Sequence, residues 1–395
     1  MTATDYDVCV AVNYYAPYVS GLTEVARVVA EGLVSRGLRV AVVACRHETG
    51  LPARETIAGV DVYRTPVVAT IGRGLVSPSF ATTVRAVARR SRLLHLHLPM
   101  LEAGLITSLV RSTPVVSTHH IDLWLPPGRV NRIATRAVEH SVRAALRRSS
   151  AAVVNSGDQA RASDMWPTLQ SMPWVSIPPP CIDRGEGRAS YRTSPGLHIG
   201  FLGRIVPDKG IQYLVKAFAG ISDPGARLLI GGDHAGVAGG SVIEMVAAAA
   251  AADPRIRILG LLRGQELADF YASIDVFALP SVAESFGIVQ AEAMMRSIPC
   301  VTTDLPGGRY PVQATGFGKI VPPAQPEPLR EAILSLAGLD PARRAAGAAS
   351  ATEQFSVQSC LHRYATLFEA VLARSPGRPL PAGEWQPPSH QITLN

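Results

Sequence analysis

Hydrophobic and polar positions alternate along residues 7–178, where short apolar runs are separated by longer segments with one apolar face. The short runs predict β-strands over Asp7–Asn13, Arg39–Ala44, Val60–Pro66, Leu93–Leu98, Pro114–Thr118, Ala151–Asn155 and Trp174–Ile177. The longer segments predict helices over Thr23–Arg36, with Thr23 as the cap, and over Ser79–Arg92, Leu101–Arg111 and Val130–Arg148. Continuously apolar strands between helices are typical of a parallel sheet covered on both faces.

A proline-rich break at Pro178–Pro180 interrupts this pattern, which begins again after Pro195. Strands are then predicted over Leu197–Leu202, Arg227–Ile230, Arg255–Leu259, Val276–Leu279 and Cys300–Thr302. Helices are predicted over Ile211–Phe218, Val242–Ala252, Gln265–Ser273 and Ile288–Arg296. The repeated alternation indicates a second α/β domain.

Two Rossmann-like domains are expected, because 395 residues exceed what one hydrophobic core usually contains. The predicted domains cover residues 1–180 and 195–355. A helix over 356–374 is expected to pack back on the first domain, and 375–395 are expected to form a flexible tail. Ligands of such sheets bind at the carboxyl ends of the strands. Two such domains that face each other would create a deep cleft.

The composition, with 47% hydrophobic and 17% charged residues, favours a packed globular protein. No apolar run is long enough to span a bilayer, and the first residues show no signal-peptide pattern. The five cysteines are scattered, which is typical of reduced thiols. These observations predict a cytoplasmic protein.

The net charge of +7 lies in the first 178 residues, which contain 19 arginines and 12 acidic residues. The strongest basic segment contains Arg129, Arg132, Arg136, Arg143, Arg147 and Arg148. It favours an anionic acceptor or an anionic membrane, which would be the inner face of the plasma membrane; the alternative is a solvated helix face. Nucleic acid is not expected as a partner, because an aromatic content of 6% offers no interleaved basic and aromatic face.

The stretch Pro280–Glu292 contains two carboxylates, Glu284 and Glu292, on either side of a loop that turns into a helix at Gly287. A helix start offers free N–H groups and a positive dipole end to a phosphate. Carboxylates accept hydrogen bonds from sugar hydroxyls. Because carboxylates repel a phosphate, this site also requires cations.

Suitable cations follow the predicted strand Leu197–Leu202, at its carboxyl end. Arg204 and Lys209 could both reach a diphosphate, and the alternative is a solvated surface turn. A weaker anion site is predicted at Ser20-Gly21-Leu22, between the first strand and the first helix.

Three motifs together resemble glycosyltransferase family 4: Gly203–Gly210, the two glutamates at 284 and 292, and Asn13–Pro17 followed by Gly21. The resemblance covers roughly residues 7–372 and implies the GT-B fold with retention of anomeric configuration. The pieces Leu96–Pro99 and Thr118–Pro126 are similar to a bacterial branch that builds cell-surface polysaccharides.

The resemblance implies a role for each matching residue on the donor side. Arg204 and Lys209 would neutralise the diphosphate, and Gly21 would donate a backbone N–H to it. The transferred sugar and distal phosphate would be held by Glu284 with the backbone of Phe286, Gly287 and Ile288. Glu292 would bind the ribose, and the base would lie near Gly260–Leu262, with Leu262 in contact.

On the acceptor side, the family's active-site histidine matches His120. Its position at a strand's carboxyl end beside Asp122 favours a role at the site, with Asp122 on the acceptor side. The alternative is a histidine that packs against the sheet or lies at the surface. His119 is expected to be a neighbour, and His95 and His97 are expected to face one side of their strand as structural residues.

The predicted function is therefore a hexosyltransferase-type enzyme that moves a sugar from a nucleoside-diphosphate sugar to an acceptor hydroxyl, in cell-surface glycan or glycolipid assembly. The acceptor would be a glycan, a lipid-linked molecule or a small molecule. No cofactor or metal is expected, because the cations and the helix start can stabilise the diphosphate. The alternatives are glycosylation of a soluble secondary metabolite and a nucleotide-sugar epimerase of the same two-domain shape.

Overall fold

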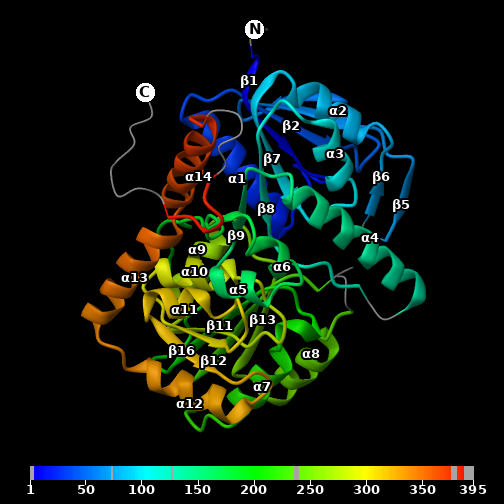
Figure 1. Ribbon diagram of the computed structural model, residues 1–395. Coiled ribbons are helices and arrows are strands. Elements are labelled where there is room, and N and C mark those ends of the chain that lie inside the picture. Colours follow the sequence, from blue (N-terminus) through cyan, green and yellow to red (C-terminus); the bar gives the residue numbers. More distant parts are fainter. Residues whose placement is uncertain (1–3, 73, 126–127, 235–239, 375–379, 387–395) are drawn as a thin grey trace. The chain divides into compact units, whose positions relative to one another are not determined.

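The computed structural model describes residues 4–72, 74–125, 128–234, 240–374 and 380–386. The chain forms two compact units, one from Met1–Pro180 and Val357–Asn395, the other from Cys181–Ser356. Each unit is a largely parallel sheet with helices (Figure 1). No helix among the described residues is both long and apolar enough to span a bilayer.

The first unit contains a nine-stranded sheet in the order β17-β10-β9-β8-β7-β1-β2-β4-β3. Its strands are β1 (Tyr6–Ala11), β2 (Val40–Cys45), β3 (Arg54–Ile57), β4 (Val60–Thr65), β7 (Ser91–Leu98), β8 (Val115–His119), β9 (Ala151–Val154), β10 (Pro173–Ser176) and β17 (Gly383–Glu384). All neighbours are parallel except β3 and β4. A separate hairpin joins β5 (Ala69–Ile71) and β6 (Gly74–Val76).

The helices of the first unit are α1 (Gly21–Ser35), α2 (Phe80–Ala88), α3 (Ala103–Leu109), α4 (Arg129–Leu146), α5 (Gly157–Ala162), α6 (Trp166–Leu169) and α14 (Val357–Leu372). Helices α1 and α14 lie side by side on one face of the sheet, and α2 and α3 lie on the other (Figure 1). The α1–α14 contact is close at Gly32, where a Cβ would lie 2.3 Å from Leu361 Cδ1. A larger residue at position 32 would therefore require the side chain of Leu361 to move.

The ends of the predicted helices differ from the observed ones in two places. Helix α1 begins at Gly21 with Ser20 as its cap, so the prediction of Thr23 as the cap was wrong. Thr23 instead completes a capping box, in which each of the two side chains accepts a hydrogen bond from the other residue's backbone N–H. The helix predicted to reach Arg92 ends at Ala88, because Ser91 already pairs with Tyr6 in the sheet.

The second unit contains a six-stranded parallel sheet in the order β13-β12-β11-β14-β15-β16. Its strands are β11 (His198–Leu202), β12 (Arg227–Gly231), β13 (Ile256–Gly260), β14 (Val276–Leu279), β15 (Cys300–Thr303) and β16 (Gly318–Val321). Its helices are η1 (Pro207–Lys209), α7 (Ile211–Ala219), α8 (Ile243–Ala252), α9 (Gln265–Ala272), α10 (Ile288–Met295), α11 (Tyr310–Thr315), α12 (Pro326–Ala337) and α13 (Pro341–Phe355).

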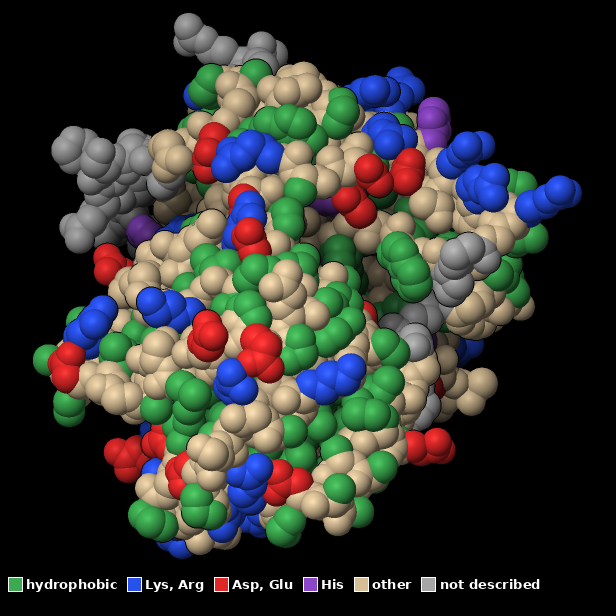
Figure 2. All heavy atoms as spheres, turned by 90° about the horizontal axis from the view of Figure 1, so that it is seen from below, with side chains coloured by type: hydrophobic (Ala, Val, Ile, Leu, Met, Phe, Trp, Pro, Cys, Tyr) green, Lys and Arg blue, Asp and Glu red, His purple; other side chains and the backbone are tan. Residues whose placement is uncertain are grey.

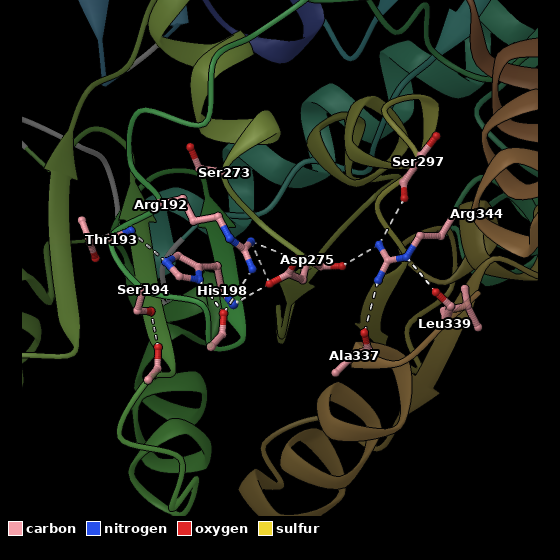
Figure 3. Close-up of polar contacts among 12 residues, drawn as sticks. Arg192, Thr193, Ser194, His198, Ser273, Asp275, Ser297, Ala337, Leu339 and Arg344 are labelled. Atoms are coloured by element: carbon pink, nitrogen blue, oxygen red, sulfur yellow. Dashed lines mark hydrogen bonds and ion pairs between the residues drawn. The ribbon is translucent and has the colours of Figure 1, made fainter. Parts of the chain in front are cut away.

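Asp275 anchors the amino ends of β11 and β14 in the second unit (Figure 3). Its carboxylate accepts hydrogen bonds from Arg192 at 3.0 Å and from the backbone N–H of His198 at 2.8 Å. Its carbonyl accepts a bond from Arg344 at 3.0 Å. Burial lowers the pKa of His198, whose neutral Nε2 accepts from the N–H of Thr193 at 3.3 Å. This network holds the edge of the sheet opposite to the strands' carboxyl ends.

The region predicted as a flexible tail contains a short strand. Residues 383–384 form β17, which pairs in parallel with β10 through Pro173 and Trp174. Residues 375–379 and 387–395 of the predicted tail lie outside the described residues.

Candidate active site

The loops that follow β11 and β14 lie together because these two strands are neighbours, with Ile199 paired to Val276. The backbone N–H of Val282 donates to the carbonyl of Asp208 at 2.8 Å. Gly210 has φ of +67°, and a Cβ there would lie 1.8 Å from the carbonyl oxygen of Pro280. Only glycine fits this left-handed position and this close contact, so the sequence Lys209-Gly210 fixes the lysine beside the second loop.

Lys209 and Glu284 form an ion pair at this edge of the sheet. Lys209 Nζ lies 2.7 Å from Glu284 Oε2, and the two side chains are 17% and 11% exposed. Burial raises the pKa of Glu284, but Lys209 and the N–H of Ser285 lower it by more, so the pKa lies below its ordinary value. The structure thus brings together two predicted site residues as a charged, sheltered pair.

Arg204 lies on the same loop and is more accessible. Its side chain is 41% exposed, and its Nη2 lies 3.4 Å from Asp208 Oδ2. At this exposure the pair with Asp208 contributes little to stability.

The turn into α10 is built as the sequence predicted. Gly287 caps the helix with φ of +78°, and a Cβ would lie 2.6 Å from Gln290 Nε2. The ring of Phe286 is 1% exposed, so this residue offers its backbone and not its side chain. Ile288 is the first residue of α10.

Gln290 is a structural residue of this turn that the sequence did not indicate. Its buried Nε2 donates to the carbonyls of Phe286 and Gly308, at 2.7 and 2.6 Å. It therefore joins the helix start to the loop that follows β15. The only hint in the sequence is a glutamine among the apolar residues at the start of the predicted helix.

Glu292 is more deeply buried than Glu284, with 2% of its side chain exposed. Its Oε1 lies 2.6 Å from Arg184 Nη2, and its Oε2 accepts from the hydroxyl of Tyr271 at 3.1 Å. Burial raises the pKa of Glu292 above its ordinary value, although Arg184 and Tyr271 act in the opposite direction. The sequence did not predict these two partners.

Leu262 follows β13, where the nucleotide base was predicted. It is 6% exposed and packs over Gly231, where a Cβ would lie 3.0 Å from Leu262 Cδ1. Gly21, in the first unit, is the first residue of α1, and a Cβ there would meet nothing within 4 Å. Its surroundings are therefore open on that side.

His120 lies just after β8 in the first unit and is 6% exposed. Its Nε2 lies 2.8 Å from Nδ1 of His97, and the two rings are stacked at 5.1 Å. Burial, together with His97 and His119, holds the pKa of His120 well below its usual value. The ring is therefore neutral, and the bond to His97 sets which nitrogen carries the proton.

Asp122 is hydrogen-bonded to His119, the residue that precedes His120. Its carboxylate lies 3.0 Å from Nε2 of His119 and accepts from Ser163 at 2.7 Å. The neighbouring N–H of Asp164 donates to it at 3.0 Å. The side chains of His119 and Asp122 come together because the chain turns after β8. The sequence did not predict this turn. Asp122 therefore fixes the loop that carries His120.

His95 and His97 are buried and lie on one side of β7, as expected from their spacing. His95 Nε2 lies 2.7 Å from Thr118 Oγ1, which lies 3.1 Å from the hydroxyl of Tyr364 on α14. His95 has the predicted structural role. His97 differs, because it contacts the candidate active-site histidine directly.

Comparison with known protein families gives one match in each unit. Residues 20–166 match the family described as glycosyl transferase 4-like domain. Residues 196–338 match the family described as glycosyl transferases group 1. The chain belongs to the GT-B glycosyltransferases of family 4 type.

Characterised and uncharacterised relatives agree with this assignment. The glycosyltransferase is 29% identical over 208 residues to a D-inositol 3-phosphate glycosyltransferase of Corynebacterium kroppenstedtii, covering 50% of this chain and 46% of that relative's length. It is 25% identical over 335 residues to an uncharacterized glycosyltransferase of Methanocaldococcus jannaschii, covering 75% and 79%. It is 28% identical over 279 residues to the 2-deoxystreptamine glucosyltransferase of Streptomyces kanamyceticus, covering 64% and 71%.

Solved structures show the same fold. The sucrose-phosphate synthase of Thermosynechococcus elongatus matches with a TM-score of 0.71 at 17% identity, covering 94% of this chain and all (100%) of that one. HepE of Anabaena, in complex with UDP, matches with a TM-score of 0.69 at 17% identity, covering 92% and 100%. The predicted GT-B fold of this glycosyltransferase is confirmed.

Proposed function

We propose that this glycosyltransferase transfers a sugar from a nucleoside-diphosphate sugar to an acceptor hydroxyl with retention, in cell-surface glycan or glycolipid assembly. The donor binds to the second unit and the acceptor to the first. The observation that carries the proposal is the sheltered pair of Lys209 and Glu284, 2.7 Å apart at the carboxyl edge of the second sheet. HepE, which has this fold, is named as a complex with UDP and with UDP-glucose, which supports this donor class.

Donor binding would separate the ion pair of Lys209 and Glu284, and each residue would bind a different part of the donor. The Lys209 ammonium and the half-exposed Arg204 guanidinium would bind the diphosphate. The Glu284 oxygen that Lys209 releases would then accept a hydrogen bond from the sugar. The start of α10 adds its free N–H groups. Because these groups stabilise the charge that develops on the leaving diphosphate, they lower the barrier to departure without a metal.

His120 would serve as a neutral hydrogen-bonding group at the reacting centre. Its low pKa makes it unsuited to neutralise charge, but a neutral imidazole can orient a hydroxyl. The acceptor proton would then pass to the leaving diphosphate oxygen, so the C–O bond to the acceptor forms as the bond to the diphosphate breaks.

A second acceptor class is favoured by the names of the relatives. Inositol 3-phosphate and 2-deoxystreptamine are both small hydroxylated rings. Glycosylation of a soluble small molecule is therefore the second candidate.

The proposal is tested by incubating the protein with labelled UDP-, GDP- and ADP-sugars, with and without acceptors of both classes. We expect a glycoside of retained configuration by NMR that forms only with acceptor and is unaffected by EDTA. Acceptor-independent release of an epimerised sugar nucleotide would instead identify an epimerase. A requirement for a divalent ion would contradict the metal-free assignment.

A further inference from the structure

Helix α4 has an unusual first half. Its buried residues, Val142, Ala145 and Leu146, all lie in its last two turns. The first half projects away from the rest of the first unit (Figure 1). There Val130 is 77% exposed and Ile133 is 70% exposed. Large aliphatic side chains at this exposure are not explained by the packing of the unit.

Arginines border these apolar side chains. Arg129, Arg132 and Arg136 are exposed and recur at spacings of three and four residues, so they form a stripe along one side of the helix. Val130 and Ile133 each follow an arginine by one residue, which places an apolar stripe directly beside the basic one. We call these five residues the α4 surface. Figure 2 shows basic and hydrophobic side chains intermixed on its right-hand side, the side on which both α4 and the β5–β6 hairpin lie in Figure 1.

The neighbouring charges do not neutralise this surface. No acidic residue occurs between Arg129 and Val138. The nearest carboxylates along the sequence have partners, Glu139 with Arg143 at 3.2 Å and Asp122 with His119 and Ser163. The loop before α4 adds Trp124, which is 77% exposed. A solvated helix face would explain the arginines, but it leaves the exposed tryptophan, valine and isoleucine without a reason.

We propose that the α4 surface binds an anionic lipid bilayer. Val130 and Ile133 would enter the interfacial region, while the arginines bind lipid phosphates with their aliphatic stems along the apolar boundary. Trp124 suits the same depth, because tryptophan is enriched at membrane interfaces. Of the six arginines of the basic segment, only the first three are assigned to the membrane. Arg143 pairs with Glu139, while Arg147 and Arg148 lie at the other end of the helix. The proposal does not rest on the proposed function.

Sedimentation of the full chain with vesicles, without any donor, tests it. We expect binding to phosphatidylglycerol–phosphatidylcholine vesicles, none to phosphatidylcholine alone, and weakening by salt. The variant R129E/R132E/R136E should lose at least about a hundredfold in affinity, since each arginine near an anionic surface contributes about 1 kcal/mol, or about fivefold. The variant R111E/R147E/R148E makes the same change of charge elsewhere and should lose far less.

The apolar half of the surface has its own matched control. V130S/I133S should bind about tenfold more weakly, whereas V68S/I71S, which alters two similarly exposed residues at the β5–β6 hairpin, should bind as the unaltered chain does. Equal losses in both arginine variants would show a general effect of net charge and overturn the proposal. So would absence of binding to anionic vesicles, or concentration-dependent dimers that V130S/I133S abolishes.

Discussion

The carboxyl edges of the two sheets differ in how their buried polar side chains are paired. In the second unit, the buried side chains of Glu284 and Glu292 pair with the cations Lys209 and Arg184. In the first unit, His97 and His120 are buried as neutral rings that bond to each other. A buried charge needs a partner, whereas a buried histidine can release its proton. Under the proposed function, the edge in the second unit would bind an anionic ligand and the edge in the first unit a neutral hydroxyl.

Removing one member of the Lys209–Glu284 pair should have the largest effect on stability and on the transfer rate. Lys209→Ala leaves Glu284 with an uncompensated charge, which should cost about 3 kcal/mol of unfolding free energy, and lower the transfer rate about 10²–10³-fold. Urea unfolding and initial rates measure both. The double variant K209A/E284Q should regain stability but not transfer. If it regains both, the pair is structural only.

Arg184→Met tests the second ion pair of this edge. Glu292 would be left with the Tyr271 hydroxyl and the backbone of Ile182 as partners but without a cation, so the unfolding free energy should fall by about 2–3 kcal/mol. Replacing the carboxylate as well, in R184M/E292Q, should restore most of the loss. Failure of this rescue would show that Arg184 stabilises the chain through other contacts.

At the neutral edge, His97 should act as a positioning residue for His120. His97→Phe removes the 2.8 Å bond and should lower kcat about 10–100-fold with the donor KM unchanged, because the orientation of His120 is lost. His97→Asn, which keeps a polar atom near the position of Nδ1, should recover part of kcat. A loss in both variants that follows thermal stability would indicate only a packing role.

The two edges should also respond differently to pH. Burial lowers the pKa of His95 to about 3 and also lowers the pKa values of His97 and His120. Below about pH 6.5 the unfolded chain therefore binds more protons than the folded chain. Stability should be level above about pH 6.5 and fall below it by roughly 1 kcal/mol per histidine and pH unit. The lowered pKa of Glu284 acts only below about pH 4.5. Urea titrations of H95F/H97F should show a shallower loss between pH 6.5 and 5.

The sequence predicted the sheets and the main site motifs because these depend on local patterns. Apolar runs indicated the strands, and Gly210 and Gly287 stand where backbone conformation leaves no alternative. The partners of the site residues could not be predicted. Arg184 pairs with Glu292, which lies 108 positions further along the sequence, and Asp122 bonds to His119. Such pairings depend on loop paths, which hydrophobic periodicity does not determine.

The most direct test of the account is equilibrium binding of nucleoside mono- and diphosphates, measured by calorimetry with the uridine, guanosine and adenosine series. We predict that one diphosphate binds, that Lys209→Ala weakens it at least tenfold, and that the matching monophosphate is much less affected, because Lys209 would contact the diphosphate. Lys216→Ala, an exposed lysine on α7, is the control. Equal affinity of Lys209→Ala and the unaltered chain for that diphosphate would contradict the central claim.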